Sequence, residues 1–374
     1  MIITILWPAP PSHPRVLRSN EKVPKAQPSG YGLVGPYGLV SWEGDIFFPM
    51  AALLRVKGLC VEYPPGTGGV VRALGGISFE IQHGEILGVL GESGSGKTTL
   101  ARALAGILPR TAQISGGSID FSLPDSRPAC GTSASHSAKA VLISQDPGIS
   151  LNPVIRVGDQ IVEVLRANNP WSKSKCRAEA RELLRSVHLD EDPKLYDAYP
   201  HQISGGQQQR VVIAQALACR PDLLIADEPT ASLDESAIAG ILELLKRAVS
   251  ERKMALLIIT HTPELLVNYA QRVLVMYGGR VIEACGATEL FRDPLHPYTK
   301  ALLQCQNSGL THAGTRRGRR FATIAGDAPN LEMPISGCIF AARCDNRLSR
   351  CSENIPTNFQ PKSQRSVECF LYAE

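Results

Sequence analysis

The chain has 374 residues, of which 44% are hydrophobic and 20% are charged, and its formal net charge is +4. These values are typical of a folded protein with two domains, or of one large domain with appendages, and they exclude a chain too polar to form a core. The small basic excess does not indicate a nucleic-acid partner, and no apolar run is long enough to predict a membrane-spanning helix.

Residues 1–49 show no helical or strand periodicity and contain many Pro and Gly residues. The apolar stretch at residues 1–7 lacks the basic residues that begin a signal peptide. We interpret residues 1–49 either as a disordered N-terminal extension or as the result of a start codon assigned too far upstream. Met50, directly before the first strand-like run, would be the start in the second case.

Residues 50–306 alternate between strand-like and helix-like patterns, as in an α/β domain. Helical spacing predicts a helix over residues 97–108, and helical patterns predominate from about 150 to 215, for example over 175–189. This second region indicates a helical subdomain inserted into the α/β core. Two β-rich segments are predicted at 53–63 and 76–81, and a short buried strand at 85–90. Later short apolar runs predict strands of a mostly parallel sheet at 141–144, 223–226, 256–260 and 273–277.

A glycine-rich loop follows the strand predicted at 85–90 and reads GESGSGKT from Gly91 to Thr98. Its glycines allow successive amide groups to point toward phosphate oxygens, and the following helix adds the positive end of its dipole. Lys97 supplies a full charge to the β- and γ-phosphates, and the Thr98 hydroxyl is placed to bind Mg²⁺. The pattern therefore predicts contacts with the phosphates of a nucleotide from Gly91, Glu92, Ser93, Gly94, Ser95, Gly96, Lys97, Thr98 and Thr99, and the family resemblance given below implies that this nucleotide is ATP.

An acidic pair, Asp227 and Glu228, directly follows the strand predicted at 223–226. The carboxyl ends of parallel strands form the sheet edge at which α/β proteins bind ligands. We expect Asp227 to reach Mg²⁺ and Glu228 to polarise the water that attacks the γ-phosphate. The sequence thus predicts the two halves of an ATP-hydrolysing site.

A third motif, ISGGQ at residues 203–207, lies between these two, and the set in this order resembles the ABC ATPases. The resemblance implies an α/β fold: an ABC-type P-loop ATPase core with a mostly parallel sheet, an antiparallel β subdomain, an inserted helical subdomain and a small cysteine-containing C-terminal extension. It also implies that hydrolysis needs a dimer, in which the ATP of the opposite subunit is contacted by Ser204, Gly205, Gly206, Gln207 and Asp234.

Further single residues match other positions of the same family. Tyr63 resembles the aromatic residue that stacks on adenine, and His261 resembles the histidine that contacts the γ-phosphate. Gln145 resembles the glutamine that links the magnesium site to the helical subdomain and the membrane partner. The resemblance therefore implies Glu228, His261 and Gln145 as catalytic residues, with Mg²⁺ bound by Thr98, Asp227 and Gln145.

Three short strings resemble one branch of the family, the ATPases of bacterial oligopeptide and dipeptide importers. They are LHPYTK at residues 295–300, SLNP at 150–153 and AYPHQ at 198–202, and nickel importers share much of this pattern. This resemblance implies an ATP-hydrolysing subunit that powers import through separate transmembrane permease subunits, peripheral to the cytoplasmic face of the bacterial inner membrane. Its other partners would be a second ABC ATPase subunit, identical or not, and indirectly an extracytoplasmic solute-binding protein.

Two alternatives of a different class remain. A non-transport ABC ATPase acting on nucleic acid or ribosomes would resemble relatives with inserted coiled coils, zinc modules or a second cassette, and this chain has none of these patterns. A catalytically silent regulatory cassette conflicts with the intact Lys97, Asp227, Glu228 and His261.

Residues 307–374 form a linker rich in Gly and Arg, followed by an extension that resembles that of the same importers. The extension contains Cys338, Cys344, Cys351 and Cys369. Four cysteines in a segment with few large apolar residues suggest a metal site, and some relatives carry a [4Fe–4S] cluster on such residues. The spacing does not separate a cluster from zinc or from free thiols. Because every nucleotide motif lies at or before His261, we expect the ATPase core not to depend on this extension.

Overall fold

A computed structural model describes most of the chain, in the ranges 52–64, 69–122, 138–189, 192, 194–230, 235–310, 324–333 and 335–373. The predicted N-terminal extension, Asp234 and the arginines of the linker lie outside these ranges.

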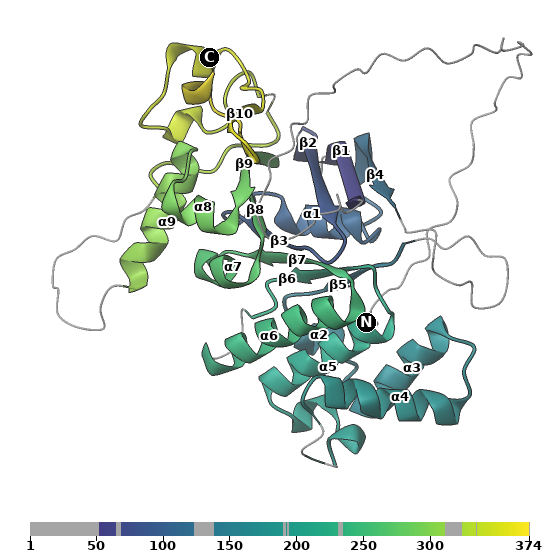
Figure 1. Cartoon of the computed structure of the whole chain (residues 1–374). Coiled ribbons are helices and arrows are strands. Elements are labelled where there is room, and N and C mark those ends of the chain that lie inside the picture. Colours follow the sequence, from purple (N-terminus) through teal and green to yellow (C-terminus); the bar gives the residue numbers. More distant parts are fainter. Residues whose placement is uncertain are drawn as a thin grey trace, which may run out of the picture.

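The centre of the fold is an eight-stranded sheet in the order β10-β11-β9-β8-β3-β7-β6-β5 (Figure 1). Its parallel strands are β8 Arg272–Tyr277, β3 Ile86–Leu90, β7 Ala255–Thr260, β6 Leu223–Asp227 and β5 Ala140–Ile143. The antiparallel strands β9 Arg280–Gly286, β11 Arg365–Val367 and β10 Phe359–Lys362 continue the sheet at one edge. Strands β3, β6 and β7 are fully buried, as expected for parallel strands covered on both faces.

A second, antiparallel sheet contains β2 Val71–Gln82, β1 Ala52–Tyr63 and β4 Gln113–Phe121. Its apolar side chains pack with α1 Lys97–Leu104 against one face of the large sheet, and this contact forms one hydrophobic core. The predicted combination of a mostly parallel sheet and an antiparallel β subdomain is confirmed.

Helices cover the other face of the large sheet and extend beyond it into the predicted helical subdomain. This subdomain contains the α-helices α2 Pro147–Ser150, α3 Val157–Asn168, α4 Lys173–Ser186 and α5 Gly205–Ala218. It also contains the short 3₁₀ helices η1 Leu195–Asp197 and η2 Pro200–Gln202. The elements α3, α4 and α5 lie at the lower end of the molecule in Figure 1, beneath α6 Glu235–Arg252. Nearer the C-terminal strands are α7 Pro263–Tyr269, α8 Ala287–Arg292 and α9 Pro297–Leu310. Among the described residues, none of these helices has the length and apolar character that crossing a bilayer requires.

Two helix boundaries differ from the sequence prediction. Helix α1 ends at Leu104 rather than near residue 108, because Gly106 adopts a left-handed conformation (φ 69°) that ends the helix. Helix α4 begins earlier, at Lys173, where the Ser172 hydroxyl accepts a hydrogen bond from the Lys175 amide (3.3 Å). Strands β4, β9, β10 and β11 were not anticipated.

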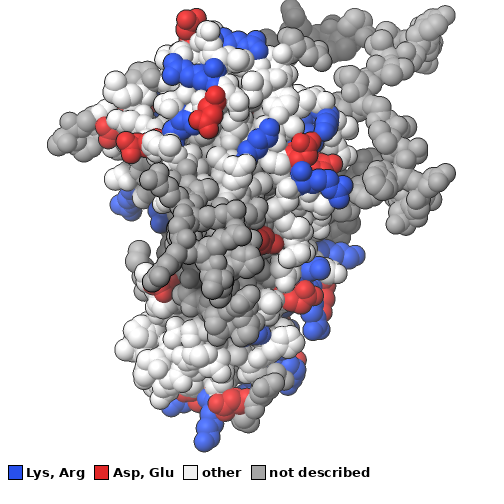
Figure 2. Space-filling model, turned by 90° about the vertical axis from the view of Figure 1, so that its left-hand side faces the viewer, with Lys and Arg blue, Asp and Glu red and all other residues white. Residues whose placement is uncertain are grey.

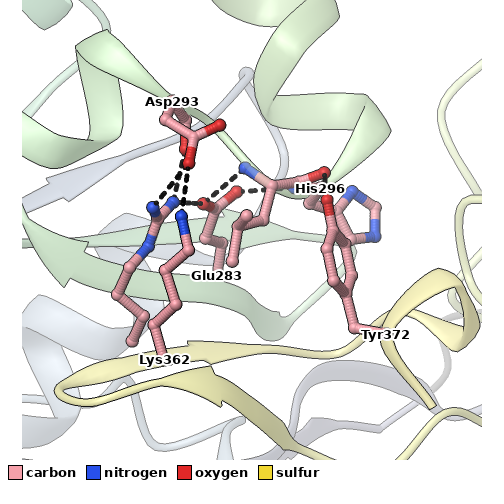
Figure 3. A network of polar contacts seen from close by, with 7 residues as sticks. Glu283, Asp293, His296, Lys362 and Tyr372 are labelled. Carbon is pink, nitrogen blue, oxygen red and sulfur yellow. Dashed lines mark hydrogen bonds and ion pairs between the residues drawn. The ribbon is translucent and has the colours of Figure 1, made fainter. Parts of the chain in front are cut away.

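The C-terminal extension joins the large sheet directly, because β11 pairs with β9. A buried carboxylate, Glu283 of β9, holds the junction by accepting hydrogen bonds from the amides of Leu295 (2.8 Å) and His296 (2.9 Å). Arg365 of β11 approaches the same carboxylate (3.4 Å) and also pairs with Asp293 (3.2 Å). Figure 3 shows these groups converging between β9 and the extension.

Two more contacts of the network close the turn at the start of α9. Lys362 reaches Asp293 (3.0 Å), and the Tyr372 hydroxyl donates to the carbonyl of Leu295 (3.1 Å) (Figure 3). Burial lowers the pKa of His296 to about 3, so this side chain is uncharged at neutral pH, and its Nδ1 accepts from the Tyr298 amide (3.0 Å). The LHPYTK string is thus largely buried where the cassette contacts the C-terminal extension.

Candidate active site

The glycine-rich loop is folded around its own lysine. The Lys97 side chain is almost fully buried, and its Nζ donates to the carbonyls of Gly91 and Glu92, both at 2.8 Å. Gly94 and Gly96 have φ values of 80° and 99°, in the left-handed region that favours glycine. Gly96 has a second constraint, since a Cβ there would lie 2.7 Å from a backbone oxygen of β2. The loop therefore requires glycine at these positions.

The interior of the loop is suited to an anion. Burial lowers the pKa of Lys97, while the negative charges of Glu228 and Asp227 oppose this shift. The Ser95 hydroxyl is buried and has no hydrogen-bond partner among the described residues. The Lys97 ammonium group, enclosed by backbone, and the unpaired Ser95 hydroxyl could both donate hydrogen bonds to phosphate oxygens that enter the loop.

The acidic pair lies where the sequence places it, at the carboxyl end of β6. Asp227 is buried and forms a side-chain hydrogen bond with Thr98. Burial raises the pKa of Asp227, and this hydrogen bond and the charge of Lys97 act in the opposite direction. A desolvated carboxylate beside a hydroxyl is an oxygen donor set that fits Mg²⁺, so these two residues match the predicted ligands.

Three predicted catalytic residues meet around the Glu228 carboxylate. Its two oxygens lie 3.1 Å from Gln145 Nε2 and 3.1 Å from His261 Nδ1, respectively. The three residues come from the segments after β5, β6 and β7, whose carboxyl ends share one edge of the sheet. Glu228 has φ 50°, which is uncommon for a residue with a side chain, and its amide donates to the carbonyl of Ile259 (2.8 Å). The backbone is thus held so that the carboxylate lies between Gln145 and His261.

Two further predicted contacts are placed less directly. Tyr63 ends β1, with its hydroxyl 3.4 Å from Thr99 Oγ1, close to the phosphate loop. Ser204 caps α5 in a capping box, in which its hydroxyl accepts from the Gln207 amide (3.3 Å) and its amide donates to Gln207 Oε1 (2.9 Å). Among the described residues, Gly205 has no heavy atom near its missing side chain, so the start of α5 is open to an approaching group.

Two residues beyond His261, the last of the predicted nucleotide motifs, contact the loop. The Glu92 amide donates to the Tyr298 hydroxyl (2.8 Å), and the Glu92 carboxylate pairs with Arg343 (2.9 Å). Tyr298 belongs to the LHPYTK string, which marked the family branch in the sequence but carried no predicted role. Nothing in the sequence pairs Arg343 with a glutamate so far away in the chain.

The four cysteines of the extension lie in one neighbourhood. The Cys338 amide donates to the Cys351 carbonyl (2.8 Å), and the Cys351 and Cys369 side chains are buried. Burial raises the pKa of Cys338 to about 11, and the charges of the other three thiols act in the same direction. Among residues 324–333 and 335–373, no three such side chains are arranged as they stand to hold a metal ion. The donor chemistry fits a metal, whereas the present side-chain positions do not form a ligand set.

Comparison with known proteins agrees with this geometry. Residues 74–231 match the ABC transporter family, and residues 282–351 match the C-terminal region of oligopeptide/dipeptide transporters. The dipeptide transport ATP-binding protein DppD of Bacillus subtilis is 38% identical over 86% of this chain and 95% of its own length. The oligopeptide transport ATP-binding protein OppD of Escherichia coli is 39% identical over 86% of this chain and 94% of its own length.

Solved structures support the same assignment of fold. The chain resembles cbiO1 of Clostridium perfringens, part of the ABC transporter complex cbiONQ, with 31% identity, 65% of this chain and 91% of that chain covered, and a TM-score of 0.53. It also resembles a dimeric ATP-binding cassette in a post-hydrolysis state with ADP and Pi, with 25% identity, 63% and 98% covered, and a TM-score of 0.52. The chain is therefore an ABC-type ATPase and belongs to the ATP-binding proteins of the oligopeptide and dipeptide transporter family.

Proposed function

We propose that this chain hydrolyses ATP to drive the import of peptides through separate transmembrane permease subunits. The observation that carries the proposal is the convergence of Glu228, Gln145 and His261 beside a phosphate loop, in a chain whose C-terminal region matches that of peptide transporters. Its relatives are named as dipeptide and oligopeptide transport ATP-binding proteins.

In this mechanism the phosphate loop binds the nucleotide and Glu228 prepares the water. Lys97 exchanges its two loop carbonyls for β- and γ-phosphate oxygens, whose negative charge favours the protonated amine and opposes the lowering of its pKa by burial. Glu228 orients the attacking water and accepts its proton, and His261 holds the opposite side of that carboxylate. Thr98, Asp227 and Gln145 would hold Mg²⁺, which would neutralise phosphate charge.

Gln145 connects this chemistry to the helical subdomain. In the structure its Nε2 donates to Glu228 (3.1 Å), which leaves its Oε1 as the atom that would bind the metal. Gln145 directly precedes the segment with α2, whose Ile149 is exposed, as is Val154 of the SLNP region. Movement of this segment by a docked permease would therefore reposition Gln145 at the nucleotide.

The proposed partners are two permease subunits and a second ABC ATPase subunit, and the solute-binding protein acts through the permease. Ser204, Gly205, Gly206 and Gln207 would complete the nucleotide site of that second subunit, as would Asp234. The proposed location is the cytoplasmic face of the bacterial inner membrane. Figure 2 shows Lys and Arg side chains interspersed with Asp and Glu over the described part of one face, a distribution unlike the basic stripe of a nucleic-acid-binding surface.

Peptide transport is tested in proteoliposomes that contain this chain, its permease subunits and their solute-binding protein. Radiolabelled di- and oligopeptides should accumulate inside only when ATP is supplied on the side of the ATPase, and the Lys97→Ala variant should give no accumulation. Uptake of Ni²⁺ without uptake of peptide would overturn the peptide assignment, and so would the absence of ATP-dependent uptake in otherwise assembled vesicles.

We also propose that Cys338, Cys344, Cys351 and Cys369 bind a [4Fe–4S] cluster once their side chains reorient. Anaerobically purified full-length protein should then be brown and contain about four iron and four sulfide per chain. A Cys351→Ser variant should lose both, whereas Cys219→Ser, a buried thiol of α5's C-terminus, should keep them. Colourless protein with about one Zn²⁺ per chain would show that the cysteines bind zinc and not a cluster. Protein without metal would show that the four cysteines are free thiols.

A further inference from the structure

One arginine of the C-terminal extension reaches the phosphate loop from a distance of 251 residues along the chain. Arg343 ends the short η3 Ala341–Arg343, and only 6% of its side chain is exposed. Its two terminal nitrogens donate to the two oxygens of Glu92, at 2.9 Å and 3.3 Å. This fork-shaped pair is the geometry in which arginine binds a carboxylate most specifically.

The guanidinium is fixed by further hydrogen bonds on its other sides. It donates to the Tyr277 hydroxyl (3.1 Å) and to the carbonyls of Ala325 and Ile324, both at 3.0 Å. Burial opposes the positive charge, yet the hydrogen bonds with Glu92 and Tyr277 raise the pKa of Arg343 above its ordinary value. Arg343 therefore stays charged, and its hydrogen bonds hold the guanidinium in one orientation.

The turn that carries Arg343 is itself anchored in the cassette. Phe340 is buried, with its ring 5.3 Å from that of Tyr277, 5.5 Å from that of Tyr298 and 5.7 Å from that of His296. These ring contacts lie in the range of favourable edge-to-face packing. The position of the guanidinium is therefore fixed by the packing of Phe340 against these rings as well as by the ion pair with Glu92.

Glu92 is the negatively charged residue of the loop predicted to bind a polyanion. Its carbonyl already accepts from Lys97, its amide donates to Tyr298, and its carboxylate acts on the charge of Lys97. Without Arg343 this carboxylate would be an uncompensated negative charge on the loop that binds the phosphates, partly shielded from water. The arginine therefore removes a repulsion as well as holding the loop.

We propose that Arg343 is a positioning residue for the phosphate loop, through which the C-terminal extension sets the affinity for nucleotide. It neutralises Glu92 and fixes the loop backbone between Lys97 and Tyr298. This inference rests on the proposed role of the loop in ATP binding and adds to it a charge supplied from outside the cassette motifs.

The test measures the Kd for ATP of full-length variants by titration calorimetry in the presence of Mg²⁺. Arg343→Ala should weaken binding about tenfold, the effect of one nearby unscreened charge. In the Glu92→Gln background, which lacks the repelling charge, Arg343→Ala should cause no further loss, so the double variant should bind ATP like Glu92→Gln, whatever the effect of that single change. The matched control is Arg347→Ala in the same extension, whose described hydrogen bonds go only to Ser352.

The double variant separates electrostatic positioning from a merely structural role. If Arg343→Ala weakens ATP binding as much in the Glu92→Gln background as in the parent, Arg343 serves only to fold the extension and the inference is overturned. Unchanged binding in Arg343→Ala overturns it as well. Lys97→Ala, measured in the same series, reports on the proposed site itself, since unimpaired binding in that variant would reject the loop as the ATP site and not the role of Arg343 alone.

Discussion

The Glu228→Gln variant should hydrolyse ATP ~10²–10³ times more slowly than the parent while still binding it, because the change removes one preorganised charged group. Glutamine retains an oxygen and an amide that can meet Gln145 and His261, so the surrounding hydrogen bonds are largely kept. With chemistry blocked, the ATP-bound dimer should persist and elute as a dimer in size-exclusion chromatography with ATP. Phosphate release measures the rate.

The control for this variant is Glu264→Gln, the same chemical change in the first turn of α7. Glu264 follows His261 closely in the chain but contacts neither Glu228 nor the phosphate loop among the described hydrogen bonds. Its hydrolysis rate should equal that of the parent. A parental rate in Glu228→Gln would instead remove Glu228 from the role of water-orienting residue.

The Ser204→Arg variant should lose ATP hydrolysis while its own phosphate loop still binds ATP. An arginine at the open start of α5 occupies the space in which backbone and hydroxyl must approach the partner's phosphate, so the dimer cannot close. Binding is measured by calorimetry and hydrolysis by phosphate release, on the chain assembled with its permease subunits.

Loss of the α5 cap is a second effect of this change and needs its own control. Ser172→Arg removes an equivalent cap from α4, where the hydroxyl likewise accepts from the amide three residues on. Each variant should be destabilised by about 1 kcal/mol in thermal unfolding. Only Ser204→Arg should lose hydrolysis, and full activity in that variant would show that the composite site does not operate here.

The elements and site residues of the cassette could be predicted because each depends on a short stretch of sequence. The glycines of the loop, the apolar runs before Asp227 and His261, and the capping serine each act over a few residues, so sequence alone places them on strands and helix starts. The arrangement around Glu228 then follows, because parallel strands bring their carboxyl ends to one edge.

The contribution of the C-terminal extension was not predictable in the same way. Its strands are short, β10 is mostly exposed, and they complete a sheet whose other strands come much earlier in the chain. The pairs Glu92–Arg343 and Glu283–Arg365 have no local signal, because only the tertiary fold brings these charges together. Glu283 lies in β9, a strand that the sequence analysis did not anticipate.

The place of β11 in the sheet has a consequence for biosynthesis. Ribosomes deliver the chain from its N-terminus, so β9 is the edge of the sheet until residues 365–367 have emerged. During that interval the hydrogen-bonding groups of β9 are open to pairing with a neighbouring nascent chain, and the Glu283 carboxylate is without Arg365. Synthesis of β11 therefore removes an aggregation-prone edge, and a chain that terminates before Arg365 keeps that edge exposed.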